Sequence, residues 1–389
     1  MKVLVLLSRV PYPLEKGDKL RAYHQIKRLS EKHDIILCCL NDKKLHPEAI
    51  RHLAPYCLEL KIIRLSKLKI YLNLLLGLFS NRPLQVNYFY SRSAQKQIDH
   101  LVERHLPKHI YCQLVRVTEY VYKYTIIPKT LDYMDALSKG VARRIPAAAP
   151  WWKPILKLEA KRLANYERAM FDRFEHKTII SEQDRQLIDH DQRDTIKVVR
   201  NGVDESFFAP MPQEKTHDLV FTGNMSYPPN IDSANYLVKE IMPLVWKQHP
   251  KANLLISGAR PVSAVKALQS ERVQVTGWVE DIRTSYARSR IFVAPMQIGT
   301  GLQNKLLEAM AMQLPCITSQ LANNALGATP GKHILIGEQP QDYARLILQL
   351  LQDVELYKLL AKNGHDFVKQ NYNWSTTTAL LEEGFEADS

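Results

Sequence analysis

Short apolar runs alternate with amphipathic helical patterns along almost the whole chain. Strands are predicted at residues 2–8, 34–40, 58–65, 109–114, 129–134, 177–181 and 196–202, and again at 218–224, 252–258, 273–277, 291–296, 316–319 and 333–337. Most runs are continuously apolar, which is typical of parallel strands covered by helices on both faces. The two consecutive β/α series predict an α/β fold of two doubly wound, Rossmann-like domains that face a central cleft.

The length of 389 residues also favours two domains over one. A stretch with Pro210 and Pro212 separates the two β/α series and is the expected linker. The expected division is a first domain at 1–203, a linker at 204–217, a second domain at 218–372, and a C-terminal helix at 373–389 that packs back toward the first domain.

The net charge of the chain limits the classes of partner that we expect it to bind. Lys and Arg number 53 against 40 Asp and Glu, a formal net charge of +13. Such a balance favours anionic partners: nucleic acid, phosphorylated small molecules or the inner face of a membrane. No basic stripe with interleaved aromatic residues is present, so nucleic acid ranks last among them.

The five cysteines show no CxxC or CxxH spacing, and the histidines are scattered without metal-ligand spacing. We therefore expect reduced core cysteines, no disulfide framework and no metal. The apolar run at the N-terminus is too short for a signal peptide, which favours a cytoplasmic protein. The motifs GxGxxG, GxxxxGK[ST], HExxH and GxSxG are absent, and we expect no cofactor.

Residues 67–85 combine an apolar stretch with basic flanks. The apolar part is about twelve residues, short of the roughly 20 that span a bilayer. The flanking basic residues are Lys61, Arg64, Lys67, Lys69 and Arg82. Two interpretations stay open: an amphipathic helix in the membrane interface, or a core-facing helix with basic ends.

The most informative chemistry lies at residues 299–315, GTGLQNKLLEAMAMQLP. Two glycines precede a helix whose unpaired first amides and positive dipole end suit an anion. Lys305 and Glu308 are three residues apart and share one face of that helix. The alternative is an ordinary exposed ion pair, but the preceding glycines favour an anion site. Glu308 would then suit a hydroxyl-bearing neighbour of the anion, such as a ribose.

Other strand ends offer weaker candidates. Gly17 lies at the expected start of a helix, near Lys16, Lys19 and Arg21. This stretch is either a binding site for an anionic group or a Pro-rich turn beside a solvated basic helix face. After the first strand of the second domain come Gly223, which permits close backbone approach, and Asn224.

The next two strands of the second domain end in SGARP and TGWVED, which contain Gly258, Arg260 and Gly277 to Val279. A base or sugar ring could lie flat against this backbone, or each glycine could serve only its turn.

Several of these stretches together resemble one family. RNGVDESFFAP (200–210) and GLQNKLLEAMAMQLPCITS (301–319) resemble the NGVD segment and the EAMA helix of the family-4 retaining glycosyltransferases, which have the GT-B fold. RVPYPLEKGDKLR, TGNMSYPPNID, VTGWVEDIR and GLQNKLLEAMA resemble, more narrowly, the sugar transferases of exosortase (PEP-CTERM) exopolysaccharide loci. The likeness follows the whole chain in order.

The resemblance implies a nucleotide-diphosphate sugar donor held mainly by the second domain. Glu308 would bind the ribose hydroxyls, the segment from Gly301 to Lys305 the diphosphate, and Val279 with Arg260 the base. Gly17 would approach the donor phosphates or the acceptor from the first domain. The implied donor-binding residues are Gly17, Gly223, Asn224, Arg260, Val279, Thr300, Gly301, Gln303, Asn304, Lys305 and Glu308.

The chain departs from the family pattern at three places. Many members carry a second glutamate eight residues before the EAMA glutamate, where this chain has Thr300. An arginine and a lysine commonly follow the first strand of the second domain, where Asn224 and Pro229 stand. A histidine usually follows the fifth strand of the first domain, where LDYMDALS offers Asp132 and Asp135. Most of these departures recur in the narrower subgroup.

The implied reaction is metal-independent retaining transfer to a glycan or polyprenyl-linked acceptor, in exopolysaccharide or cell-surface glycan synthesis. Lys305 would stabilise the leaving diphosphate and Asp135 would orient the acceptor. The expected location is the cytoplasm, with the inner face of the plasma membrane as a partner surface. Two alternatives remain: a GT-B protein that binds a nucleotide sugar without turnover, and a sugar-nucleotide 2-epimerase.

Overall fold

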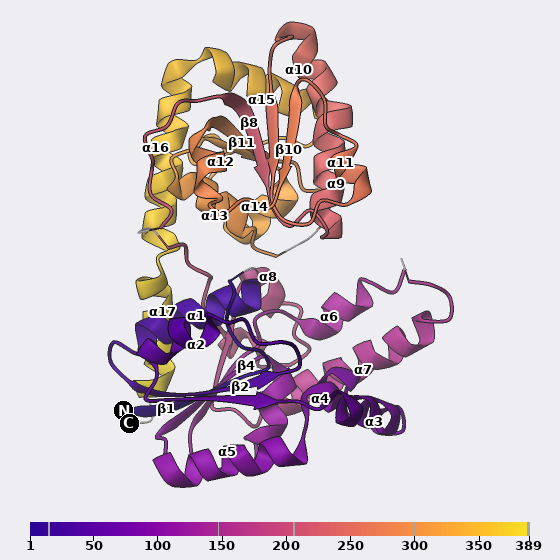
Figure 1. The fold of residues 1–389 in the computed structure, drawn as a ribbon, viewed down its shortest axis with the longest axis vertical. Coiled ribbons are helices and arrows are strands. Elements are labelled where there is room, and N and C mark those ends of the chain that lie inside the picture. The colour runs from indigo at the N-terminus through magenta and orange to yellow at the C-terminus, as the bar shows by residue number, and fades with distance from the viewer. Residues whose placement is uncertain (15, 147, 205–206, 299–300, 387–389) are drawn as a thin grey trace. The chain divides into compact units, whose positions relative to one another are not determined.

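The computed structural model describes residues 1–14, 16–146, 148–204, 207–298 and 301–386. These divide into two compact units (Figure 1). The first unit comprises Met1–Arg200 together with Trp374–Ser389, and the second comprises Asn201–Asn373.

The described part of the first unit is built on a seven-stranded parallel sheet of order β3-β2-β1-β4-β5-β6-β7. The strands are β1 Lys2–Leu7, β2 Asp34–Asn41, β3 Glu59–Arg64, β4 His109–Gln113, β5 Lys129–Asp132, β6 His176–Ile179 and β7 Lys197–Val198. Alternate residues of β1 enter different buried clusters: Leu4 and Leu6 in one, Val3 and Val5 in the other. The continuous apolar runs therefore arise, as predicted, because both faces of the sheet are covered.

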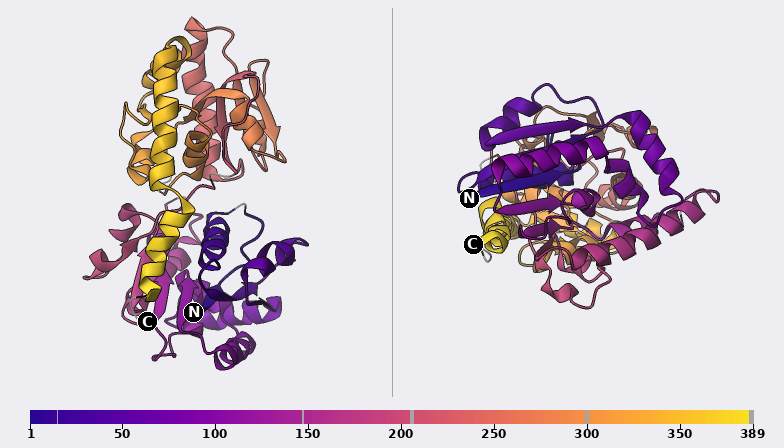
Figure 2. Two further views of the ribbon diagram at one scale, coloured as in Figure 1. Left: turned by 90° about the vertical axis from the view of Figure 1, so that its left-hand side faces the viewer. Right: turned by 90° about the horizontal axis from the view of Figure 1, so that it is seen from below.

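The α-helices of the first unit are α1 Gly17–Leu29, α2 Ala49–Leu53, α3 Lys67–Gly77, α4 Leu84–Phe89, α5 Arg92–His105, α6 Leu137–Ala142, α7 Lys153–Phe171, α8 Glu182–Arg185 and α17 Trp374–Glu386. The C-terminal helix α17 lies beside α1 (Figure 2). Its Leu381 and Phe385 join the buried cluster that contains Val3. The ring of Trp374 stacks on His24 of α1 at 4.9 Å between centroids.

The second unit repeats the plan with a six-stranded parallel sheet, within its described residues, of order β10-β9-β8-β11-β12-β13. Its strands are β8 His217–Thr222, β9 Leu254–Ser257, β10 Val273–Gly277, β11 Ser289–Ala294, β12 Cys316–Thr318 and β13 Leu335–Ile336. Its α-helices are α9 Pro228–Tyr236, α10 Met242–Gln248, α11 Ser263–Lys266, α12 Arg283–Ala287, α13 Asn304–Ala311, α14 Gln320–Leu326, α15 Pro340–Gln352 and α16 Val354–Asn371. The doubly wound strand order predicted for both domains is thus confirmed.

The boundary between the units differs from the expected one. It lies after Arg200, and the described part of the expected linker, 204–217, belongs to the second unit. Val203 is buried and its amide donates to the carbonyl of Tyr372 at 2.7 Å. Lys215 Nζ donates to the carbonyl of Ser289 at 2.8 Å. The two prolines that suggested a free linker therefore lie in a segment fixed to the domain.

Four of the five cysteines, Cys38, Cys39, Cys112 and Cys316, are buried, as expected for core residues. Burial raises the pKa of Cys38 to about 12, so this thiol stays protonated at neutral pH. Within the described ranges, no helix is long and apolar enough to cross a membrane.

Candidate functional site

The strand order of the second unit marks one place for a ligand. β8 and β11 are neighbours at the centre of the sheet, and the chain continues from them toward opposite edges. Ligands of such sheets bind outside the carboxyl ends of the strands at this switch point. The chain leaves β8 through Gly223 into α9 and leaves β11 toward α13, and these are the two segments that carry the strongest candidate residues.

Helix α13 presents its N-terminal end without a side-chain cap. The N-cap residue is Gln303, whose Nε2 donates to the carbonyl of Gly301 at 2.8 Å. An apolar stripe anchors the helix, because Leu306, Leu307 and Met310 are buried. The amides of Asn304 and Lys305, which precede the bonded amide of Leu306, are therefore held in place and available to an anion. Thr300 lies outside the described residues.

Lys305 is the cation beside these amides. Its Nζ donates to Oδ1 of Asn230 on α9, lies 3.6 Å from Sδ of Met296, and sits 4.9 Å from the ring centre of Phe221. Burial among these neutral groups lowers the pKa of Lys305 to about 7, while the carboxylate of Glu308 opposes the shift. A bound diphosphate would favour the protonated amine.

Glu308 is oriented by a chain of two hydroxyl groups. The hydroxyl of Tyr286, on α12, donates to Glu308 Oε2 at 2.7 Å and lies 2.8 Å from Oγ1 of Thr222 at the end of β8. Because the tyrosine has one proton and gives it to the carboxylate, Thr222 donates to Tyr286. Burial raises the pKa of Glu308, and the tyrosine hydrogen bond and Lys305 act in the opposite direction. The carboxylate keeps capacity to accept further hydroxyl donors.

Two glycines allow the ends of the strands to meet at this site. Gly223 has a φ of +151°, and a Cβ on it would lie 2.6 Å from Nδ2 of Asn230. Gly258 has a φ of +145°, and a Cβ there would lie 1.8 Å from the carbonyl oxygen of Gly223. Gly258 therefore serves the packing of two strand ends. Gly223 makes room for Asn230, the residue that holds Lys305.

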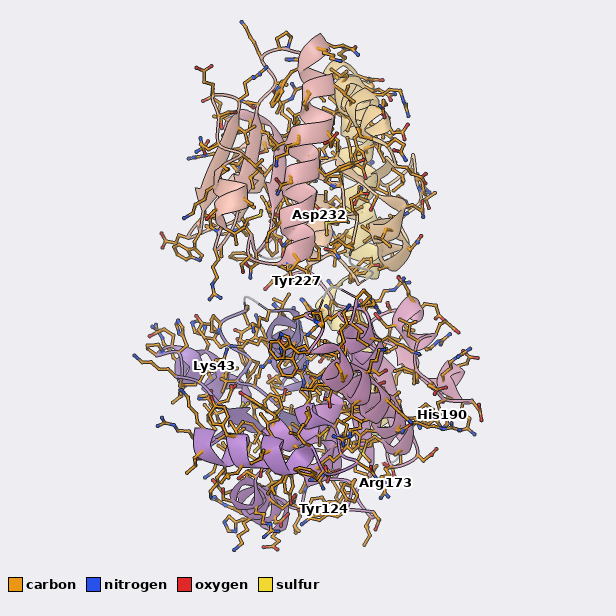
Figure 3. All side chains as sticks on the ribbon, turned by 90° about the vertical axis from the view of Figure 1, so that its right-hand side faces the viewer. Lys43, Tyr124, Arg173, His190, Tyr227 and Asp232 are labelled. Atoms are coloured by element: carbon orange, nitrogen blue, oxygen red, sulfur yellow. The ribbon has the colours of Figure 1, made fainter. Side chains whose placement is uncertain are left out.

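The remaining second-unit candidates lie on exposed turns of the same sheet edge. Asn224 is exposed, and its Oδ1 accepts from the amide and hydroxyl of Ser226 at 3.0 and 2.8 Å. This turn leads to Tyr227, which Figure 3 labels at the start of α9. Arg260 is exposed with a φ of +57°, and Val279 is half-buried. The side chain of Asn224 therefore stabilises its own turn by accepting these two hydrogen bonds.

The position of Arg21 in the first unit differs from the prediction. This residue was expected in a basic cradle around Gly17, but its side chain is fully buried. Arg21 Nε and Nη2 donate to the two carboxylate oxygens of Asp132 at 2.6 and 3.3 Å. Burial acts to lower the pKa of Arg21, but Asp132 and Tyr111 outweigh it and the net direction is upward. Gly17 itself is exposed at the start of α1, with open space where a Cβ would stand.

The same ion pair distinguishes Asp132, the last residue of β5, from Asp135, which follows that strand. Asp132 is fully buried together with Arg21 and cannot contact a substrate. Asp135 is accessible to solvent. Protein atoms crowding its carboxyl group and the nearby Asp184 raise the pKa of Asp135 to about 6, against the guanidinium of Arg116. Asp135 is thus the acid at this strand end that a substrate could reach.

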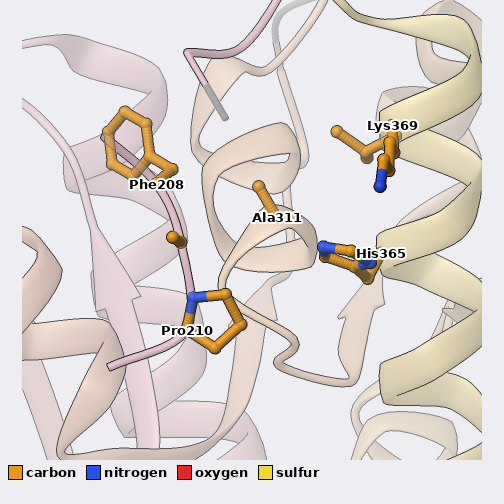
Figure 4. Close-up of a pocket in the computed structure, with 7 residues that line it drawn as sticks. Phe208, Pro210, Ala311, His365 and Lys369 are labelled. Carbon is orange, nitrogen blue, oxygen red and sulfur yellow. The ribbon is translucent and has the colours of Figure 1, made fainter. Parts of the chain in front are cut away.

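A separate hollow of about 160 Å³ lies at the other end of α13 (Figure 4). Its lining includes Phe208, Pro210, Ala311 and His365. Since the hollow is lined by Ala311, the last residue of α13, and by neither Lys305 nor Glu308, it is not part of the site at the strand ends. Throughout the described residues, no group of three or more His, Cys, Asp or Glu side chains is placed to hold a metal ion.

Sequence reasoning missed the residues that orient Lys305 and Glu308: Thr222, Asn230 and Tyr286. Thr222 and Tyr286 carry no signal, because a threonine in a strand and a tyrosine in a short helix are ordinary core residues. Asn230 is buried directly after two helix-starting prolines. The polar side chain of Asn230 at a helix position that is expected to be apolar was the one sequence signal for its role.

Residues 216–353 match the family described as glycosyl transferases group 1. The matched residues contain the whole of the strand-end site from β8 to α13. A 44.6 kDa protein of Klebsiella pneumoniae, described as uncharacterized and in the cps region, is 22% identical over 391 residues, with 96% of each chain covered.

Solved structures resemble the chain over both units. Sucrose-phosphate synthase (tll1590) from Thermosynechococcus elongatus has a TM-score of 0.70 at 15% identity, covering 100% of this chain and 99% of that chain. Anabaena Alr3699/HepE in complex with UDP-glucose has a TM-score of 0.68 at 13% identity, with 99% of each chain covered. At these identities the likeness shows the fold, which is that of the GT-B glycosyltransferases.

Proposed function

We propose that this protein is a retaining glycosyltransferase that moves a sugar from a nucleotide-diphosphate sugar to a glycan or polyprenyl-linked acceptor. The observation that carries the proposal is the pairing on α13 of Lys305 with Glu308, which are oriented by a residue of α9 and a residue of α12, respectively. One cation at an open helix N-terminus and one carboxylate a turn further match a diphosphate joined to a ribose.

In this proposal each group has one task. Lys305 and the amides from Gly301 to Lys305 bind the diphosphate, and Glu308 accepts hydrogen bonds from the ribose hydroxyls. Arg260 and Val279 lie toward the base. Support comes from the group 1 family match and from the similarly folded Anabaena protein, whose structure is a complex with UDP-glucose.

The reaction would break the bond between the anomeric carbon and the phosphate oxygen, and form one from that carbon to an acceptor oxygen. Negative charge develops on the leaving diphosphate, where protonated Lys305 and the α13 amides stabilise it. For retention, the acceptor would attack from the face that the diphosphate leaves, and its proton would pass to the departing phosphate oxygen. Asp135 would orient the acceptor hydroxyl from the first unit, and no metal step is part of the proposal.

The acceptor belongs, in our proposal, to exopolysaccharide or other cell-surface glycan synthesis on the cytoplasmic side of the membrane. Support comes from the Klebsiella relative, which is described as lying in the cps region. The basic balance of the chain suits an acceptor presented at an anionic surface.

Product analysis tests the proposal. The purified protein is incubated with UDP-, GDP-, ADP- and CMP-sugars, with and without a short polyprenyl-linked sugar, and in EDTA. We expect acceptor-dependent nucleotide release, an anomeric configuration that NMR shows to be retained, undiminished rate in EDTA, and loss of turnover in Lys305→Met. An epimerised donor without acceptor would identify an epimerase. Binding without turnover would identify a non-catalytic protein, and an inverted product would overturn retention.

A further inference from the structure

Helix α3 is apolar on two opposite sides. Its inner side, with Ile70 and Gly77 buried, packs on α4 in the first unit (Figure 1). Its outer face, as we define it here, consists of Leu68, Tyr71, Leu72, Leu75, Leu76 and the following Phe79, whose side chains are 50–88% exposed. The helix therefore does more than cover a core, and the purely core-facing interpretation of this segment is wrong.

The outer face is contiguous. At about 100° per residue, its six side chains fall on one side of the helix, opposite Ile70 and Gly77. Single exposed apolar residues are normal on protein surfaces, whereas a contiguous group of this kind marks an interaction site. Two exposed lysines, Lys67 and Lys69, border the face on its two sides in the first turn.

Charge along the chain segment that contains α3 has one sign. From residue 60 to residue 98 the chain contains seven basic residues, Lys61, Arg64, Lys67, Lys69, Arg82, Arg92 and Lys96, and no acidic residue. Arg82 pairs with Glu119 at 2.8 Å, but Arg64, Lys67 and Lys69 are exposed beside α3. A protein partner for an apolar face would not require this bias, whereas an anionic lipid surface attracts it.

The helix is fixed in its outward orientation. Nη1 and Nη2 of Arg162, on α7, donate to the carbonyls of Gly77 and Leu78 at the end of α3, both at 2.9 Å. Asn73 Nδ2 donates to the carbonyl of Tyr90 at 2.7 Å. These bonds hold the inner side and the C-terminal end, so the outer face cannot turn inward without breaking them. With 11 residues, α3 is about 16 Å long and too short to span a bilayer.

We propose that the α3 outer face inserts into the interfacial layer of an anionic lipid bilayer, with Arg64, Lys67 and Lys69 at the head groups. The helix lies parallel to the membrane plane. This face would bring the proposed transferase to a polyprenyl-linked acceptor. Only this role of the face rests on the proposed function. The docking itself requires neither donor nor acceptor.

Vesicle flotation of the full chain, without nucleotide sugar, tests this directly. We expect binding to vesicles of phosphatidylglycerol mixed with phosphatidylcholine and much weaker binding to phosphatidylcholine alone. The triple variant Leu72→Gln/Leu75→Gln/Leu76→Gln should lose about tenfold in partitioning for each leucine withdrawn. Lys67→Gln/Lys69→Gln should lose most of the preference for phosphatidylglycerol. Because the leucines are exposed, the triple variant should keep the wild-type Tm.

The matched control is Val354→Gln/Leu359→Gln on α16, where the two side chains are 56% and 53% exposed and lie in the other unit. This variant should bind vesicles like the wild type. The proposal is overturned if the wild type does not float with anionic vesicles, or if the triple variant floats equally well. It is also overturned if sedimentation velocity shows a dimer that the triple variant abolishes while vesicles bind neither protein. Sugar transfer to a water-soluble acceptor should survive the triple variant, which separates failed docking from a failed function.

Discussion

Lys305 should make nucleotide-sugar binding depend on pH. In the free protein, burial lowers the pKa of Lys305 to about 7. A diphosphate raises the pKa again, because it favours the charged amine. Below pH 7 the amine is already protonated and affinity should not vary. Above pH 7 binding must take up a proton, so the dissociation constant should rise with pH until the pKa of the complex is reached.

The magnitude follows from the pKa of Lys305 in the free protein. Each pH unit above that value, up to the pKa of the complex, corresponds to an affinity that is about tenfold weaker, or about 1.36 kcal/mol. Between pH 7, where half of the free protein already carries a neutral amine, and pH 9, the dissociation constant should therefore rise about 25- to 50-fold, or about 1.9–2.3 kcal/mol, if the pKa of the complex lies at 9 or above. Both phosphates of the donor are diesters with constant charge in this range, so the ligand itself adds no slope.

Isothermal titration calorimetry at pH 6, 7, 8 and 9 measures the dissociation constant and its dependence on pH. In two buffers of different ionisation enthalpy at pH 8, it should count the uptake of about one proton per donor bound. Lys305→Met should bind weakly with no dependence on pH. A constant dissociation constant in the wild type would refute the reasoning, as would a slope that survives in Lys305→Met.

Three further variants test the supporting structure. Tyr286→Phe removes the hydroxyl that donates to Glu308, the carboxylate proposed to bind the ribose, and calorimetry at pH 7 should show a tenfold to hundredfold loss of nucleotide-sugar affinity, about 1.5–3 kcal/mol. Gly258→Ala should lower the urea unfolding free energy by more than about 2 kcal/mol, whereas Gly17→Ala, with open space for its Cβ, should not. Asp132→Asn should cost about 3 kcal/mol in the same assay because Arg21 keeps a buried, uncompensated charge; an unchanged stability would contradict the buried ion pair.

The fold was predictable because its signal is local. Continuous apolar runs such as DIILCCL, between helical patterns, indicate parallel strands covered on both faces, and β2 has this burial. The unit boundary was not predictable from Pro210 and Pro212, because prolines mark a break in secondary structure and not a break in packing. Phe208 and Lys215, which attach that segment to the second unit, have no local pattern.

The site was predictable in part. Lys305 and Glu308 share a helix face by their spacing, and glycines before a helix suggest an open N-terminus. The orientation of both side chains depends on Asn230 and Tyr286, which lie far away in sequence and meet α13 only in the folded sheet. Arg21 shows the same limit: a basic residue near a helix start reads as a surface charge, and only the fold reveals its partner Asp132.

The central claim is that Lys305 and Glu308 of α13 hold a nucleotide sugar, and a thermal-shift screen tests it most directly. Wild type, Glu308→Ala and the exposed-surface control Glu271→Ala are melted with UDP-, GDP-, ADP- and CMP-sugars. A donor at a hundred times its dissociation constant adds about 2.7 kcal/mol of stability. The account predicts that one nucleotide class raises the Tm of wild type and Glu271→Ala but not of Glu308→Ala. Equal shifts in all three proteins, or a shift with none of the donors, would contradict it.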